Sequence, residues 1–312
     1  MKDRVTWLDL LRGGAMLIVV LGHTSGAPNG IIQFFKPIEI PLFIFISGCL
    51  YKMMPFKVMI KKSLCGLIIP YWIMSTIISI LLTGEVWRHI ATHDLQYLIN
   101  RFLNIMLGRT FWFIPCLIVI QLLFWVIRKL FAHGWCVLCI AISLLSMFLF
   151  NGLRCNLPYH IDNALMLLGY FAIGNFYYHN QQRFSAKKQF LLWLPAVYGI
   201  CVYWHLTAEK IVWNASTNDF GNIFVFALAS ITGIVMLVEA GKRIKEIKLV
   251  NLVGRNTFQV YFWQDRTVAL CAKIFPDVLW GAKWVMAVAI ATAVGIGFKK
   301  CFPFTVKLSL KG

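Results

Sequence analysis

A permanent cation and an imidazole lie within one apolar segment near the start of the chain. Residues 9–26 read DLLRGGAMLIVVLGHTSG and hold Asp9, Arg12 and His23 among aliphatic side chains. Arg12 and His23 are eleven positions apart, which in a helix is three turns plus about 20°, so both side chains share one face. Ionisable groups in an apolar span usually face a protein interior or a water-filled cavity. We therefore interpret this face as functional.

The two side chains differ in the chemistry that they offer. Along a helix they stand about 16 Å apart, with the guanidinium near one end and the titratable imidazole near the other. Glu39, at the same end of the next apolar stretch as His23, supplies a carboxylate that could orient the imidazole for general-base catalysis of acyl transfer. A simpler alternative remains open: Asp9 pairs with Arg12, and His23 only terminates its helix.

Composition identifies the class of protein that must position these residues. Apolar residues make up 60% of the 312 residues and charged residues only 13%, as in a multi-span membrane protein. We predict an all-α, polytopic protein in which residues 1–312 form one transmembrane domain of about ten helices. The apolar windows are residues 7–25, 38–51, 64–82, 111–131, 135–150, 164–178, 189–206, 221–239, 250–272 and 279–298.

The net charge of +18 comes from basic residues dispersed between the apolar windows. Nineteen of the thirty lie in segments that one orientation places in the cytoplasm, against nine on the outer side. The positive-inside rule then predicts that both termini are cytoplasmic, and it accounts for the charge without a nucleic-acid partner. The longest outer connection, residues 83–110, has an amphipathic pattern and is expected to lie on the membrane surface as an interfacial helix.

Other readings of the sequence are weaker. The nine cysteines lie mostly in apolar runs, including Cys136 and Cys139, so we expect no metal site, disulfide or permanently bound cofactor. The first apolar segment could be a cleaved signal peptide, but Asp3, Asp9 and Arg12 favour a retained span.

Several motifs together resemble the acyltransferase-3 family of integral membrane O-acyltransferases, and within it the bacterial enzymes similar to fucose 4-O-acetylase. The basic residue Arg12, ten intervening positions and His23 match the family's first motif. PLFIFISGCLY, KKSLCGLIIPYW, FWFIPCLIVIQLL and LVGRNTFQVYFWQ look like its later motifs in the same order. Cys65 replaces a second basic residue often found in the third span, and Gln264 stands where a histidine is common.

The resemblance implies an O-acetyltransferase in the bacterial cytoplasmic (inner) membrane. It would transfer an acyl group, expected to be acetyl, from cytoplasmic acetyl-CoA to a hydroxyl of a surface polysaccharide or of its lipid-linked precursor. His23 would be the catalytic base and Arg12 a companion that helps to hold the donor. Two alternatives remain open: a polysaccharide exporter of the same family, and a non-catalytic protein of glycan assembly.

Each expected role falls on particular residues. The catalytic set is His23, Glu39 and Arg12; the acyl-CoA set is Arg12, Lys61, Lys62, Ser47, Arg255 and Asn256; the acceptor set is Trp112, Gln264 and Asp265. Phosphates of the donor would meet the basic members at the cytoplasmic side, while Ser47, Asn256 or Trp112 could stabilise an oxyanion. Structural alternatives are a topogenic role for the basic residues, an interfacial anchor for Trp112 and a rim charge for Asp265.

Overall fold

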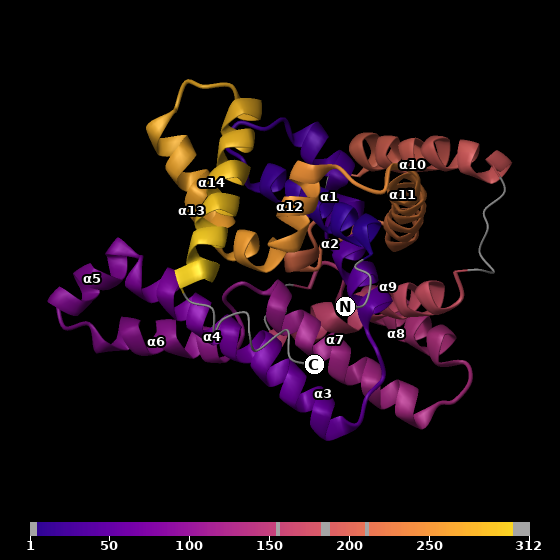
Figure 1. Ribbon diagram of the computed structural model, residues 1–312, viewed down its shortest axis with the longest axis horizontal. Coiled ribbons are helices and arrows are strands. Elements are labelled where there is room, and N and C mark those ends of the chain that lie inside the picture. Colours follow the sequence, from indigo (N-terminus) through magenta and orange to yellow (C-terminus); the bar gives the residue numbers. More distant parts are fainter. Residues whose placement is uncertain (1–4, 154–156, 182–187, 210–211, 302–312) are drawn as a thin grey trace.

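The computed structural model describes residues 5–153, 157–181, 188–209 and 212–301, and within these ranges every regular element is a helix (Figure 1). The longer helices are α1 (Thr6–His23), α2 (Asn29–Leu50), α7 (Phe113–Leu130), α8 (Trp135–Phe150), α9 (Ile161–His179), α10 (Lys188–Ala208), α11 (Ile223–Ile244), α13 (Thr257–Ile274) and α14 (Trp280–Cys301). The shorter ones are α3 (Phe56–Ser63), η1 (Leu64–Ile68), α4 (Ile69–Thr76), η2 (Ile77–Leu81), α5 (Gly84–Ala91), α6 (Leu95–Met106), η3 (Pro158–His160), η4 (Ala215–Thr217) and α12 (Lys248–Arg255).

The all-helical class is confirmed for the described residues, and six stretches are long and apolar enough to cross a membrane. They are α1, α2, the continuous run Phe56–Leu81, α7, α11 and α14. The other four expected windows coincide with α8, α9, α10 and α13, so a total of ten spans stays a prediction, as does the side on which the termini lie. Of the basic residues in the topology argument, Lys2, Arg4, Arg154, Arg183, Lys187, Lys210, Lys307 and Lys311 lie outside the described residues.

Helix α1 lies at the centre of the half of the molecule that carries the candidate residues, in contact with α2, α11, α12, α13 and α14 (Figure 1). Two glycines allow its close approach to α12. A Cβ atom on Gly13 would overlap the carbonyl oxygen of Val250, and one on Gly254 would overlap that of Asp9. Small residues permit such backbone contact between membrane helices. The packing brings the end of α12 beside the N-terminal half of α1.

Helix α2 packs on its other side against α9, again through glycines. A Cβ atom on Gly48 would overlap the carbonyl oxygen of Phe171, and one on Gly174 that of Phe45. Asn175 Nδ2 donates to the carbonyl oxygens of Gly48 and Tyr51, at 3.0 and 2.9 Å. The bond to Tyr51 satisfies a carbonyl at the C-terminal end of α2, and the bond to Gly48 adds to the one that the Gly48 carbonyl accepts from Tyr51 N.

The expected window 250–272 is interrupted near its start. The backbone of Asn256 is non-helical, with φ −119° and ψ 19°, and its side chain donates to the carbonyl oxygen of Leu252 at 2.8 Å. Because Asn readily bonds to nearby backbone groups, it favours such helix ends. The break separates α12 from α13, and it lets α13 run beside α1 and α14.

The expected interfacial segment forms two helices, α5 and α6, that project from the bundle (Figure 1). Both expose large apolar side chains, namely Trp87, Ile90, Leu95, Ile99, Phe102 and Leu103. Asp94 caps α6 by accepting from Tyr97 N at 3.0 Å. This backbone bond lowers the pKa of Asp94. The exposed apolar faces suit a position on the membrane surface, which stays a prediction.

Candidate active site

A cavity of about 680 Å³ opens beside the end of α1 that carries His23. Its walls come from α1, α2, η2, α6, the segment just before α7, residues 212–216 and α13. Five residues that the sequence singled out line it: His23, Glu39, Trp112, Gln264 and Asp265. We call this space the outer cavity.

His23 contacts a carboxylate, but it is that of Asp265 and not that of Glu39. The Nδ1 atom of His23 lies 3.4 Å from Oδ1 of Asp265, and the two side chains are 48% and 53% exposed. A carboxylate at this distance stabilises the positive charge that the imidazole gains when Nε2 accepts a proton. Glu39 instead is buried and pairs with Lys36 at 2.8 Å. Among the described contacts, Asp265 and not Glu39 is therefore the carboxylate beside His23.

A second cavity, of about 230 Å³, lies beside α1 at Arg12 and Met16, and we call it the inner cavity after the predicted orientation. Arg12, Ser47 and Arg255 line it, together with aromatic side chains that include Phe43, Phe113 and Phe258. Val19, Ile40 and Tyr261 line both this inner cavity and the outer one. The two spaces are therefore neighbours along α1, with Arg12 at one and His23 at the other.

Arg255 is the last residue of α12 and lines the inner cavity, at the end that faces the cytoplasm in the predicted orientation. Its Nε lies 3.6 Å from Oδ2 of the buried Asp9, and its Nη2 lies 3.4 Å from Oε1 of Glu246. The side chain of Arg255 is 42% exposed. Asp9 thus contacts Arg255 across helices, its pairing with Arg12 stays a prediction, and two guanidinium groups line one small cavity.

Tyr261 is a functional candidate that the sequence did not single out. Its hydroxyl oxygen accepts the N–H of Phe113 at 3.3 Å, and no acceptor for its own proton is recorded among the described residues. A phenol in this state can still donate one hydrogen bond. Its place between the two cavities puts that donor where the inner cavity meets the outer one. The only signal in the sequence is its position in the late motif, LVGRNTFQVYFWQ.

Other predicted site residues are placed less directly. Lys61 and Lys62 are exposed on α3 and line neither cavity. Asn256 is buried and bonded to the backbone of α12. Ser47 lines the inner cavity, but its hydroxyl donates to the carbonyl oxygen of Phe43 at 2.8 Å. Gln264 is buried, and its Oε1 has no hydrogen-bond partner in the described part of the chain.

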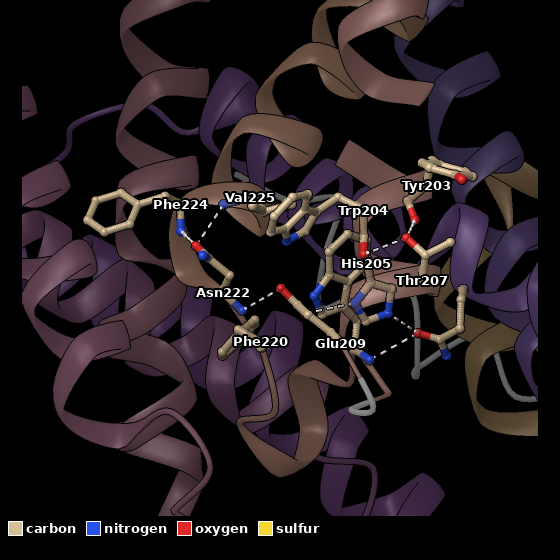
Figure 2. Close-up of polar contacts among 12 residues, drawn as sticks. Tyr203, Trp204, His205, Thr207, Glu209, Phe220, Asn222, Phe224 and Val225 are labelled. Carbon is tan, nitrogen blue, oxygen red and sulfur yellow. Dashed lines mark hydrogen bonds and ion pairs between the residues drawn. The ribbon is translucent and has the colours of Figure 1, made fainter. Parts of the chain in front are cut away.

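A buried cluster holds the wall of the outer cavity that residues 212–216 form (Figure 2). The His205 ring stacks on Trp213 at 3.6 Å between centroids, and its Nδ1 and Nε2 lie 2.9 Å from Glu209 Oε2 and 3.3 Å from Gln33 Oε1. Gln33 Oε1 also accepts from Trp213 N at 2.9 Å, and Glu209 Oε1 accepts from Asn222 N at 3.0 Å. The cluster ties this wall to α2, α10 and the start of α11.

The described residues contain no group of three or more His, Cys, Asp or Glu side chains that could hold a metal ion. The ionisable groups that line these two cavities are imidazole, carboxylate, ammonium, guanidinium and phenol.

Comparison with known proteins identifies the family. Searches of curated proteins and of solved structures gave no match. A family model described as an acyltransferase domain, that of the acyltransferase-3 family, matches residues 5–299 and so includes both cavities and every helix from α1 to most of α14. The chain belongs to the acyltransferase-3 family and is a membrane acyltransferase.

Proposed function

We propose that this enzyme transfers an acetyl group from cytoplasmic acetyl-CoA to a hydroxyl of a bacterial surface glycan or of its lipid-linked precursor. It would do so in the cytoplasmic membrane, with the donor in the inner cavity and the acceptor in the outer one. The observation that carries the proposal is that two neighbouring cavities meet at Tyr261, with Arg12 and Arg255 at one and the His23–Asp265 pair at the other.

The inner cavity suits the donor. Acyl-CoA carries several phosphate charges on a slender pantetheine arm, and guanidinium groups bind phosphate oxygens through paired hydrogen bonds. Arg12 and Arg255 are the guanidinium groups at this cavity, whose remaining wall is largely apolar and aromatic. In this arrangement Lys61 and Lys62, exposed on α3, meet only the part of the donor that stays outside the cavity.

The outer cavity suits a sugar. Its lining combines amide and hydroxyl groups with an aromatic surface: Asn29, Gln33, Asn214, Ser216, Thr110 and Trp112. Such groups can pair with sugar hydroxyls, and an aromatic ring can cover the apolar face of a pyranose. A volume of about 680 Å³ leaves room for more than one sugar unit.

The reaction follows from this placement. His23 Nε2 takes the proton of the acceptor hydroxyl as its oxygen attacks the thioester carbonyl, and Asp265 stabilises the imidazolium that forms. The Tyr261 hydroxyl donates to the developing oxyanion. The intermediate then collapses, the C–S bond breaks, and the CoA thiolate takes the proton from His23. The products are the acetyl ester and CoA, with His23 neutral again.

Radioactive acetyl transfer in proteoliposomes tests this function. Purified protein with labelled acetyl-CoA and a membrane-glycan extract should give labelled glycan, and His23→Ala should lower the rate by at least about a hundredfold, as removal of a general base does. His133→Ala is the matched control, because His133 is exposed in the loop between α7 and α8 and lines neither cavity. Near-normal transfer by folded His23→Ala would refute the catalytic assignment. Glycan transport without any acetylation would favour the exporter.

A further inference from the structure

Two arginines reach the outer cavity from different helices, and both donate hydrogen bonds to carbonyl groups of η2. Arg101 belongs to α6 and Arg266 to α13, and both line the cavity. Arg101 Nε donates to the carbonyl oxygen of Ser79 at 3.2 Å. Arg266 Nη2 donates to the carbonyl oxygen of Ile78 at 2.9 Å and to the hydroxyl of Thr83 at 2.6 Å. These bonds fix one edge of each guanidinium.

The other edges have no recorded protein acceptor. Within the described residues, neither Nη atom of Arg101 has a hydrogen-bond partner, nor do Nε and Nη1 of Arg266, and neither side chain forms an ion pair. A guanidinium carries five N–H groups and keeps its charge at any pH that the protein meets. Each arginine therefore retains donors and a full positive charge at the cavity wall.

The charges of the outer cavity do not balance around this pair. Its ionisable lining residues are His23, Lys36, Glu39, Arg101, Asp265 and Arg266. Lys36 and Glu39 neutralise each other at 2.8 Å, and Asp265 contacts His23. With the imidazole neutral, Asp265 is one negative charge against two guanidinium groups. Neutral hydrogen-bond donors would suffice to bond the carbonyl oxygens of η2, so these bonds do not account for two positive charges. The surplus positive charge is available to bind an anionic ligand.

We propose that Arg101 and Arg266 form an anion subsite that binds a carboxylate or phosphate group of the acceptor. This inference rests on the proposed function, and it narrows the acceptor to an acidic glycan or a glycosyl phosphate. Paired guanidinium groups bind both anions through short, charge-assisted hydrogen bonds. Because Arg266 directly follows Asp265 in the chain, the anionic group would be bound close to the hydroxyl that His23 activates, and it would orient the sugar.

Residue-specific chemical protection tests the subsite without relying on catalysis. The wild-type protein in phosphatidylcholine nanodiscs is treated with phenylglyoxal, which modifies accessible arginines, and the labelling rate of each arginine is measured by peptide mass spectrometry. The probes are glucuronate, glucose 1-phosphate and glucose. At about ten times its Kd, a bound probe should slow the labelling of Arg101 and Arg266 about tenfold by mass action. Arg88, exposed on α5 and outside the cavity, is the control and should react equally throughout.

The outcomes separate the two sources of the anion. Protection by glucuronate alone supports a sugar carboxylate, protection by glucose 1-phosphate alone supports a glycosyl phosphate, and protection by both supports the anion subsite as such. Equal protection by glucose, or none by either anion, would overturn the inference.

Variants supply a second measurement. Arg101→Gln and Arg266→Gln keep N–H donors but remove the charge, and each should weaken glucuronate or glucose 1-phosphate binding by about tenfold or more, as expected for a charge-assisted bond. Glucose binding and the Arg88→Gln control should not change. A protein that shows protection but no acetyl transfer would keep the subsite and refute the proposed function. If acetyl transfer occurs, and neither substitution changes anion binding, the proposed function is kept and the subsite is refuted.

Discussion

Asp265 Oδ1 lies 3.4 Å from Nδ1 of His23, although Asp265 is on α13 and His23 is on α1, far apart in the chain. Their contact depends on the packing of α13 beside α1, which follows the break at Asn256 and the close approach of α12 through Gly254. The pair that we assign to catalysis is thus built by tertiary structure, and each part of the proposed site can be tested separately.

Replacing Asp265 by Asn should lower kcat by at least about tenfold while the acetyl-CoA KM stays near its wild-type value. The amide keeps the size of the side chain but cannot stabilise an imidazolium. Glu39→Gln should affect stability more than the chemical step, because Glu39 pairs with Lys36. Initial rates at saturating substrates measure kcat, and thermal unfolding in detergent measures stability. A larger fall in kcat for Glu39→Gln than for Asp265→Asn would return the orienting role to Glu39.

The inner cavity predicts which basic residues matter for the donor. Arg12→Gln and Arg255→Gln should each raise the KM for acetyl-CoA about tenfold or more, since each removes a charge-assisted contact. The double change Lys61→Gln and Lys62→Gln should have a smaller effect, because both side chains lie outside the cavity. Rates with varied acetyl-CoA at saturating acceptor give the comparison. An equal effect of the lysine pair would extend the donor site to α3.

Tyr261→Phe tests the proposed oxyanion donor. It removes one hydroxyl and keeps the ring, which packs against Phe111 and Phe113. Loss of one such donor should lower kcat about a hundred- to a thousandfold with both KM values little changed. Tyr71→Phe is the control, because Tyr71 is buried, bonds to the carbonyl oxygens of Ile105 and Thr110, and lines neither cavity. A wild-type kcat in folded Tyr261→Phe would show that another group stabilises the oxyanion.

Much of the helical framework could be predicted from the sequence, because apolar length and periodicity report helices directly. The shared face of Arg12 and His23 follows from their spacing alone, and the structure places both at cavities. Partners across helices are different. Glu39 and Asp265 are both acidic residues near an outer end, and only the neighbours of α1 show which of them reaches His23.

Two further features carried weak local signals. Asn256 directly follows Arg255 within an apolar window, and a single Asn does not reveal whether a helix ends there or continues. In the sequence, Tyr261 is one of several aromatic residues in a span. Only the structure shows that it lines both cavities. Lys61 and Lys62 show the reverse case: a basic pair at a span end suits phosphate binding by composition, yet the fold leaves both exposed on α3.

The environment of His160 predicts that the stability of the folded protein depends on pH. Burial lowers the pKa of His160, which bonds to Asn163 and has its ring 5.9 Å from that of Trp112; Asp162 and Arg109 are the charged groups near it. Its ordinary pKa is 6.5. The unfolded chain binds the proton more readily, so the stabilising contribution is full above this value and is lost as the pH falls through the lower pKa of the folded state.

Thermal unfolding of the protein in detergent should therefore occur at lower temperature when the pH is reduced from about 7.5 to about 5.5. His160→Asn, which cannot take up the proton, should show a smaller change over the same interval. An identical pH dependence in this variant and the wild type would assign the effect to other groups.

The position of the His205 cluster predicts that its disruption raises the KM for the acceptor and not the KM for acetyl-CoA. Both ring nitrogens face oxygen atoms, of Glu209 (Figure 2) and of Gln33, so His205→Ala removes the donor to Glu209 Oε2, one of the two donors to Gln33 Oε1, and the stack on Trp213. Such a loss costs about 3 kcal/mol of unfolding free energy. Because residues 212–216 and Gln33 line only the outer cavity, the acceptor KM should rise while the acetyl-CoA KM does not. His205→Gln restores one donor and should recover part of the stability, whereas His133→Ala should change neither KM. Equal rises in both KM values for folded His205→Ala would show that the cluster supports the whole bundle and not the acceptor wall.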